Sequence, residues 1–251
     1  MTLRIEPLAC LADNYAYLVR STGRVAVVDP GDAKPIEEAL ERLGLELDEI
    51  WCTHHHPDHV AGVPELLARR PGVVVRGSEY DRAHGRIAGQ THAHADDARF
   101  DFEGHPVRVL EIPGHTLGAI AFVVDDALFS GDTLFLGGCG RVFEGTMPMM
   151  AASMDRLRQL DPSTRVYCGH EYTLSNLRFA LSVEPESVAI AEAIEAARAA
   201  RDAGRPTVPG TLARELATNP FLRFDRPEIA GSLSPDASFA RLRQAKNEFR
   251  G

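Results

Sequence analysis

The sequence predicts an α/β domain followed by a smaller helical domain. Over the first two-thirds of the 251 residues, short apolar runs alternate with turn signals and helical patterns. Three later apolar runs each lead at once into a polar loop, an arrangement typical of strand ends in sheets covered by helices. From about Leu174 onward, helical patterns and prolines replace the strands. We therefore predict an α/β domain over residues 1–173 and a helical domain over residues 174–251.

The elements of the first part follow from local patterns. Three apolar runs bounded by turn residues predict strands, the first two as a hairpin: Asn14–Val19, Arg24–Val28 and Glu49–Cys52. A helix is predicted where Ile36, Leu40 and Leu43 recur at helical spacing, with Gly44 as its C-terminal cap. A further helix is predicted over Val60–Arg70, where Pro64 is tolerable only near the first turn.

The later strands end at polar loops. The three predicted strands are Val107–Ile112, Ala127–Ser130 and Arg165–Cys168, and they lead into His115, Asp132 and His170 respectively. In the C-terminal part, Val188, Ile190 and Ile194 lie in an Ala/Glu/Arg-rich helix bounded by Pro185 and Gly204. Phe239, Leu242 and Phe249 mark one side of a last helix.

Composition narrows the possible partners. The net charge of −9 argues against nucleic-acid binding, which usually requires a basic face. No apolar run approaches the roughly 18 residues that a membrane span requires, and the N-terminus does not resemble a signal peptide. The four cysteines form no C-x-x-C pair. We expect them to be reduced thiols in the cytoplasm.

Residues 53–59 read T-H-H-H-P-D-H and predict a metal site. His54 and His56 are two residues apart, so an extended backbone directs both to the same side while His55 points away. The chain then turns at Pro57, and Asp58 and His59 approach from another direction. Imidazole and carboxylate suit zinc, iron or manganese. Because no cysteine has a matching spacing, a catalytic site is favoured over a closed structural zinc site.

His115, Asp132 and His170 add three candidate ligands from separate strand ends. With His54, His56, Asp58 and His59 they make seven, which is too many for one ion that keeps an open position and suits two ions. The alternative is a histidine tract that binds metal adventitiously at the surface. This is disfavoured because the tract follows an apolar strand that is predicted to be buried. The remaining candidates are interpreted as packing or solvated histidines: His84, His92, His94 and His105. His92 and His94 have H-x-H spacing but lie in a polar stretch, so we expect both to be solvated.

These residues resemble the signature T/H-x-H-x-D-H of the metallo-β-lactamase superfamily, and further segments are similar to the glyoxalase II (hydroxyacylglutathione hydrolase) family. Those segments are Gly138–Arg141, Phe143–Thr146, Cys168–Thr173 and Asn219–Phe221. The resemblance covers essentially the whole chain. It implies a metallo-β-lactamase-like four-layer αββα sandwich followed by a helical domain that closes over glutathione.

The resemblance also implies roles for the candidate residues. One metal ion would be held by His54, His56 and His115, and the other by Asp58, His59 and His170. Asp132 would bridge the two ions, and Asp58 and Asp132 would be the catalytic carboxylates. Zinc is the preferred ion, with iron or manganese as alternatives.

Five further residues are implied to contact glutathione: Arg141, Phe143, Tyr172, Arg243 and Lys246. Arg243 and Lys246 are three residues apart, so they share a face of the last helix. Arg141 stands where the family has a lysine. Phe143 stands where the family commonly has a tyrosine, and the missing hydroxyl removes one hydrogen bond, worth about 1 kcal/mol.

The implied activity is hydrolysis of S-(2-hydroxyacyl)glutathione by a monomeric enzyme. A thiol with a pKa near 8.5 departs as thiolate without an obligatory acid, which suits a site with no extra acid beyond the ligands. Alternatives are a superfamily hydrolase acting on a lactone, another thioester, a β-lactam or a phosphodiester, a mononuclear-iron persulfide dioxygenase, and a non-catalytic binding module. The acidic charge disfavours a nuclease.

Overall fold

The computed structural model describes residues 3–250, which divide into two compact units. Unit 1 comprises residues 3–111 and 118–131, and unit 2 comprises residues 112–117 and 132–250. The loop that carries His115 therefore belongs with the C-terminal part of the chain. The predicted division at residue 173 stays a prediction.

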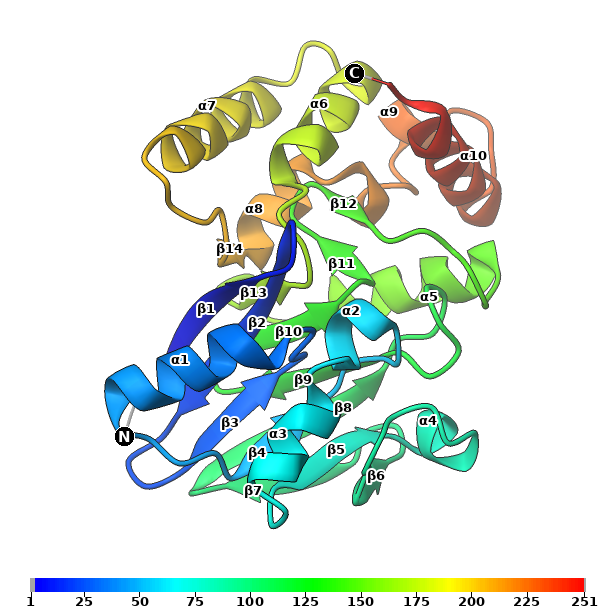
Figure 1. Cartoon of the computed structure of the whole chain (residues 1–251). Helices are drawn as coiled ribbons and strands as arrows, with labels where there is room; N and C mark the ends of the chain where they lie inside the picture. Colours follow the sequence, from blue (N-terminus) through cyan, green and yellow to red (C-terminus); the bar gives the residue numbers. More distant parts are fainter. Residues whose placement is uncertain (1–2, 251) are drawn as a thin grey trace. The chain divides into compact units, whose positions relative to one another are not determined.

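Unit 1 contains a six-stranded sheet (Figure 1). Its strands lie side by side in chain order: β1 (Arg4–Cys10), β2 (Asn14–Arg20), β3 (Val25–Val28), β4 (Glu49–Trp51), β5 (Val74–Ser78) and β6 (His92–His94). β2 and β3 pair antiparallel with Leu18 opposite Val27, which confirms the predicted hairpin. From β3 to β6 the pairs are parallel, so the loops that follow β3 and β4 emerge at the same edge.

Four antiparallel strands form a second sheet in unit 1, ordered β10-β9-β8-β7. They are β7 (Arg99–Phe102), β8 (His105–Glu111), β9 (Ile120–Val124) and β10 (Ala127–Gly131). The fully buried Trp51 of the first sheet packs against Phe100, Phe102 and Phe122 of the second, with ring centroids 5.2–5.5 Å apart. Aromatic side chains therefore fill the space between the two sheets.

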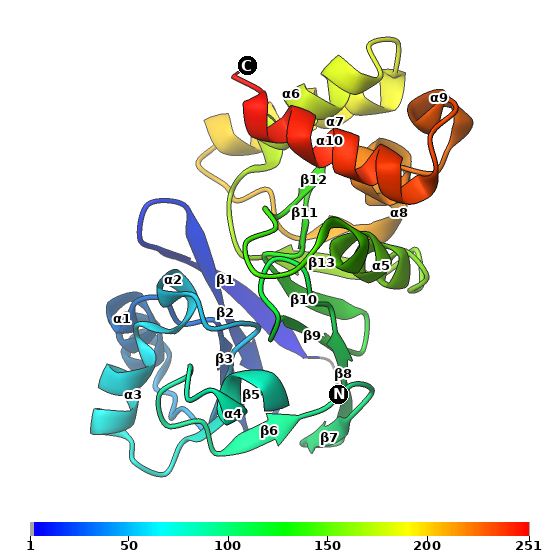
Figure 2. The same cartoon turned by 90° about the vertical axis from the view of Figure 1, so that its right-hand side faces the viewer.

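Helices cover the other face of the first sheet (Figures 1 and 2). The helices of unit 1 are α1 (Ala33–Leu43), α2 (Pro57–Val60), α3 (Val63–Arg69) and α4 (Glu79–Ala83). Ile36 of α1 and Leu66 of α3 belong to one buried cluster with Leu18, Val27 and Ile50 of the sheet. Asp32 caps α1 at its start, and Gly44 ends it in the left-handed conformation as predicted.

The helix predicted over Val60–Arg70 is wrong in its extent. The structure has two short helices there, α2 and α3, separated by Ala61 and Gly62. Pro57 and Pro64 each lie in the first turn of their own helix, where the missing N–H costs nothing. Gly62 lies so close to the turn after β3 that an added Cβ would come within 2.6 Å of the carbonyl oxygen of Pro30. Close packing of Gly62 against Pro30 therefore accompanies the break in the helix. It also keeps the segment of residues 53–59, here called the histidine loop, next to the turn after β3.

Unit 2 combines short strands with most of the helices. The strands are β11 (Leu134–Phe135), β12 (Gly138–Cys139), β13 (Arg165–Cys168) and β14 (Gly210–Thr211); β11 pairs with β12 and β13 with β14. The helices are α5 (Met147–Leu157), α6 (Thr173–Val183), α7 (Val188–Asp202), α8 (Leu212–Thr218), the 3₁₀ turn η1 (Pro220–Leu222), α9 (Pro227–Ala230) and α10 (Pro235–Glu248). The predicted helices around Ile190 and Phe239 are thus present as α7 and α10.

Two apolar clusters hold these helices. α6 and α7 pack through Leu177, Ala180 and Ile190. Phe221 of η1 and Phe239 of α10 are fully buried with ring centroids 5.7 Å apart. Within residues 3–250, no helix has the length and apolar character needed to cross a bilayer.

Two groups of sequence predictions concern isolated side chains. All four cysteines are buried and free, and burial raises the pKa of each thiol, to about 11 for Cys10 and about 12 for Cys168. His92 is exposed as expected, but the prediction that His94 is solvated is wrong. His94 stacks on Phe100 in the interior, and burial lowers its pKa to about 4.

Candidate active site

The four candidate ligands of the histidine loop lie together in unit 1. The ring of His54 is 4.8 Å from that of His56 and 4.2 Å from that of His59, measured between centroids. Nε2 of His59 is 3.7 Å from Oδ2 of Asp58. His55 lies against Asp81 instead, with 3.3 Å between Nδ1 and Oδ1. The loop after β4 therefore gathers one carboxylate and three imidazoles.

Asp29, which the sequence analysis did not single out, organises this loop. One of its oxygens accepts from the backbone N–H of Thr53 at 2.7 Å, and the other accepts from the Thr53 hydroxyl at 2.6 Å. The second oxygen is also 3.0 Å from Nδ1 of His59. A carboxylate that binds Nδ1 holds the ring so that Nε2 is the ligand atom. The available signal was that Asp29 directly follows β3, just as the predicted ligands directly follow their strands.

Asp58 is positioned by contacts from the start of β2 and from the turn after β3. Asn14 donates through Nδ2 to Oδ2 of Asp58 at 3.0 Å. Gly31 packs so closely that an added Cβ would lie 1.9 Å from the carbonyl oxygen of Asp58. Only glycine fits at that position without displacing the backbone of the loop.

The three later candidate ligands lie together in unit 2. Oδ2 of Asp132 is 3.5 Å from Nε2 of His115 and 3.3 Å from Nε2 of His170. Nδ1 of His115 lies 2.8 Å from the carbonyl oxygen of Arg141, so the ring donates from Nδ1 and presents Nε2. All three side chains are buried. The carboxylate thus lies between two imidazoles, as a ligand shared by two ions would.

The donor set fits divalent metal ions. Imidazole and carboxylate are the groups that zinc, iron and manganese accept, and the rings of His59 and His115 are each held from Nδ1. The structure brings together four predicted ligands in unit 1 and three in unit 2. That the two groups share one centre stays a prediction.

A pocket of about 490 Å³ in unit 2, here called the Arg243 pocket, contains two of these ligands. All five residues predicted to bind glutathione line it together with His115 and Asp132. Phe143 is 62% exposed with its ring 5.3 Å from that of His115, while Tyr172 stacks on His170 at 4.7 Å. The pocket therefore joins candidate metal ligands to a set of cations and aromatic rings.

Arg243 and Lys246 extend from α10 to this pocket in different ways. Arg243 is buried and donates through Nη1 to the carbonyl oxygen of Cys139 at 2.6 Å. Lys246 is half-buried and donates through Nζ to the backbone oxygen of Ser175 at 3.1 Å. Burial and, to a smaller extent, the neighbouring Arg243 cation lower the pKa of Lys246 to about 8. Lys246 therefore loses its charge as the pH rises through about 8.

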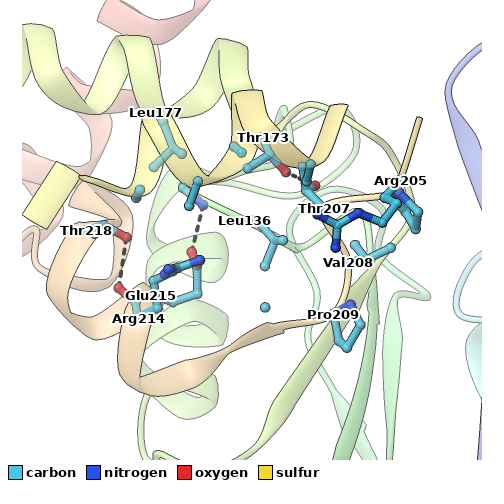
Figure 3. A pocket seen from close by; sticks show the side chains of 17 residues that line it. Leu136, Thr173, Leu177, Arg205, Thr207, Val208, Pro209, Arg214, Glu215 and Thr218 are labelled. Carbon is cyan, nitrogen blue, oxygen red and sulfur yellow. Dashed lines mark hydrogen bonds between the residues drawn. The ribbon is translucent and has the colours of Figure 1, made fainter. Parts of the chain in front are cut away.

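A second pocket in unit 2, of about 240 Å³, is here called the Glu215 pocket (Figure 3). Its walls include four alanines and two prolines, with Glu215 on one side. Glu215 is buried, and burial raises the pKa of its carboxyl to about 7 although hydrogen bonds from Gly137 and Asn219 lower it. None of the seven candidate ligands lines this pocket, so it is not the candidate active site.

Comparisons with known proteins identify the family of this chain. Residues 12–170 match the metallo-beta-lactamase superfamily, and residues 171–249 match the hydroxyacylglutathione hydrolase C-terminus. Hydroxyacylglutathione hydrolase of Synechococcus sp. (strain JA-3-3Ab) is 48% identical over 254 residues, covering 98% of this chain and 100% of its own.

Two solved structures share the fold. ETHE1 from Myxococcus xanthus has a TM-score of 0.65 at 22% identity, covering 98% of this chain and 97% of its own. TTHA1623 in a di-iron-bound form has a TM-score of 0.61 at 25% identity, covering 86% and 98%. The predicted metallo-β-lactamase-like fold with a C-terminal helical region is confirmed. The chain belongs to the hydroxyacylglutathione hydrolase family of the metallo-β-lactamase superfamily.

Proposed function

We propose that this chain hydrolyses the thioester of S-(2-hydroxyacyl)glutathione, releasing glutathione and a 2-hydroxy acid. The observation that carries the proposal is the Arg243 pocket, which places His115 and Asp132 beside Arg141 and Lys246. Glutathione is an anion with two carboxylates, so a pocket with several cations complements it. The named relatives support the same substrate class.

We further propose that two divalent ions occupy the site. His54, His56 and His115 would hold one ion, Asp58, His59 and His170 the other, and Asp132 would bridge them. A pair of such ions would supply a nucleophilic hydroxide at neutral pH and would stabilise negative charge on the thioester oxygen. Zinc is preferred, with iron or manganese as alternatives. TTHA1623 was solved in a di-iron-bound form, which supports a dinuclear site.

Different residues of the chain would orient the attacking water and bind the substrate. Asp132, between His115 and His170, would orient the attacking water by accepting its hydrogen bond. Arg141 and Lys246 would hold the carboxylates of the glutathione part, which fixes the scissile bond relative to Asp132. The leaving thiol has a pKa near 8.5, so it departs as thiolate and no residue has to protonate it.

Hydrolysis of S-lactoylglutathione tests this proposal directly. The metal-replete protein should release glutathione with a free thiol and lactate in equal amounts. A thioester of the same acyl group on a short thiol that lacks the glutathione carboxylates should react with a much lower kcat/KM. Equal kcat/KM for the two thioesters would remove the assigned role of the Arg243 pocket.

Replacing Lys246 by alanine should raise KM about tenfold and change kcat little, because a charge-assisted hydrogen bond to substrate is lost. In the wild type, KM should also rise with pH as Lys246 loses its proton near pH 8. Steady-state kinetics from pH 6.5 to 9.5 measure both effects. Lys246→Arg, which keeps its charge over this range, serves as the control and should show a flat KM. A loss confined to kcat would contradict a binding role.

Phe143→Tyr should lower KM by a few-fold, since the exposed ring at the pocket would gain a hydroxyl able to bond glutathione. The control is Phe100→Tyr, which changes the same side chain in the second sheet of unit 1. That variant should leave KM unchanged. An unaltered KM in Phe143→Tyr would show that the residue does not contact the substrate.

A further inference from the structure

The β11–β12 hairpin forms one wall of the Arg243 pocket, because Phe135, Cys139 and Gly140 line it. The same segment follows Asp132 directly, and the N–H of Gly140 donates to the carbonyl oxygen of Thr133 at 3.2 Å. Two residues beyond the end of β12 at Cys139, the carbonyl oxygen of Arg141 accepts from Nδ1 of His115. A shift of this hairpin would therefore move both the substrate wall and the partner of a candidate metal ligand.

The hairpin has only two residues in each strand, so its own ladder contributes little rigidity. Side chains from distant helices bind its backbone instead. Asn176 of α6 donates to the carbonyl oxygen of Leu136 at 3.2 Å, and Arg243 of α10 donates to that of Cys139. Each bond satisfies a buried backbone group.

Further contacts come from Glu215 within α8 and Asn219 at its end. An oxygen of Glu215 accepts from the N–H of Gly137 at 2.7 Å. Nδ2 of Asn219 is 2.9 Å from the carbonyl oxygen of Gly138, 3.2 Å from that of Phe135 and 3.0 Å from the same Glu215 oxygen. Glu215 is 2% exposed and Asn219 is 0% exposed, so bulk solvent has little access to these bonds. Together the two side chains bind both strands of the hairpin and its turn.

We propose that the buried Glu215–Asn219 pair is a positioning device for the reaction: it holds the β11–β12 hairpin in the conformation that forms the substrate wall of the Arg243 pocket. Neither side chain lines that pocket, so both act through the hairpin. Glu215 instead lines the Glu215 pocket. Figure 3 shows its carboxylate in a hydrogen bond, which it accepts from the N–H of Gly137. The kinetic part of this inference rests on the proposed thioester hydrolysis, whereas its structural part does not.

Glu215→Met and Glu215→Gln test the inference as a pair. Methionine keeps the length of the side chain but removes the acceptor, while glutamine keeps an oxygen that can accept from Gly137 and Asn219. In Glu215→Met, amide hydrogen exchange of residues 135–140 should accelerate about tenfold, and KM for S-lactoylglutathione should rise about five- to tenfold, with a smaller fall in kcat. In Glu215→Gln, both should stay within about twofold of the wild type.

Thr218→Ala is the matched control on α8. Thr218 is also buried, but its hydroxyl donates to the carbonyl oxygen of Arg214 within the same helix. This variant should lose stability yet keep wild-type exchange in the hairpin and wild-type KM. Should Glu215→Met fail to fold, Asn219→Ala removes the bonds to Phe135 and Gly138 and should reproduce the same pattern.

Exchange is measured without substrate, so it decides the positioning role even if the thioester is not hydrolysed. Unchanged exchange and KM in a folded Glu215→Met would overturn the inference. The same holds if Glu215→Gln behaved like Glu215→Met, because an accepting oxygen would then be insufficient. Faster hairpin exchange in Thr218→Ala would reduce the effect to general destabilisation and would overturn it as well.

Discussion

Asp132→Asn should reduce turnover of S-lactoylglutathione by about a thousandfold or more while leaving the fold intact. The carboxylate lies between Nε2 of His115 and Nε2 of His170, and an amide of the same shape removes its negative charge from that position. A neutral amide binds divalent ions weakly and no longer compensates their charge. Because Asn has nearly the same volume, the buried site keeps its packing.

Steady-state kinetics and metal analysis on the same sample measure this effect, and thermal unfolding shows that the variant is folded. Asp161→Asn is the matched control: it makes the same exchange in unit 2, at an exposed carboxylate that binds Ser163. It should retain wild-type turnover. Near-normal activity in Asp132→Asn would exclude a bridging role.

Asp29→Asn should lower the affinity for one of the two metal ions by about 10- to 100-fold. The carboxylate accepts through one oxygen from the Thr53 N–H and faces Nδ1 of His59 with the other. An amide has only one oxygen, so if it keeps the bond to Thr53 it turns an NH₂ group toward His59. The ring would then accept at Nδ1 and carry its proton on Nε2, the atom required as a ligand.

Metal titration of the apo protein should then give one tight and one weakened binding event, with activity following the second. Asp32→Ala is the control, since Asp32 lies three residues away and caps α1 by accepting from the N–H of Lys34. That substitution should cost about 1 kcal/mol of stability without changing metal affinity. Two unaltered metal affinities in Asp29→Asn would show that Asp29 does not orient His59.

The candidate ligands that directly follow strands could be predicted from the sequence, because the loops after parallel strands lie at the same edge of a sheet. In unit 1, β3 and β4 run parallel, so their C-terminal loops meet at one edge and bring Asp29 to His59. The histidine loop was evident because five of its seven residues have side chains that can bind metal. Asp29 was missed because Asp29-Pro30-Gly31 reads as an ordinary turn. Its role depends on tertiary contacts with residues 24 and 30 positions away.

The helix boundaries and the contacts of the β11–β12 hairpin were harder to predict from the sequence. The split between α2 and α3 depends on the close approach of Gly62 to Pro30, which periodicity does not report. The contacts of Glu215, Asn219 and Arg243 with the β11–β12 hairpin join residues 78 to 104 positions apart. Buried polar side chains of this kind look in the sequence like ordinary helix residues. Their function becomes apparent only when their backbone partners are known.

A metal count per chain, coupled to an S-lactoylglutathione assay on the same sample, tests whether two ions at the seven proposed ligands carry out the hydrolysis. Activity should rise with metal content until two ions are bound per chain, and chelation should abolish it reversibly. Full activity with a single ion, or a protein with two ions that leaves the thioester intact, would contradict it.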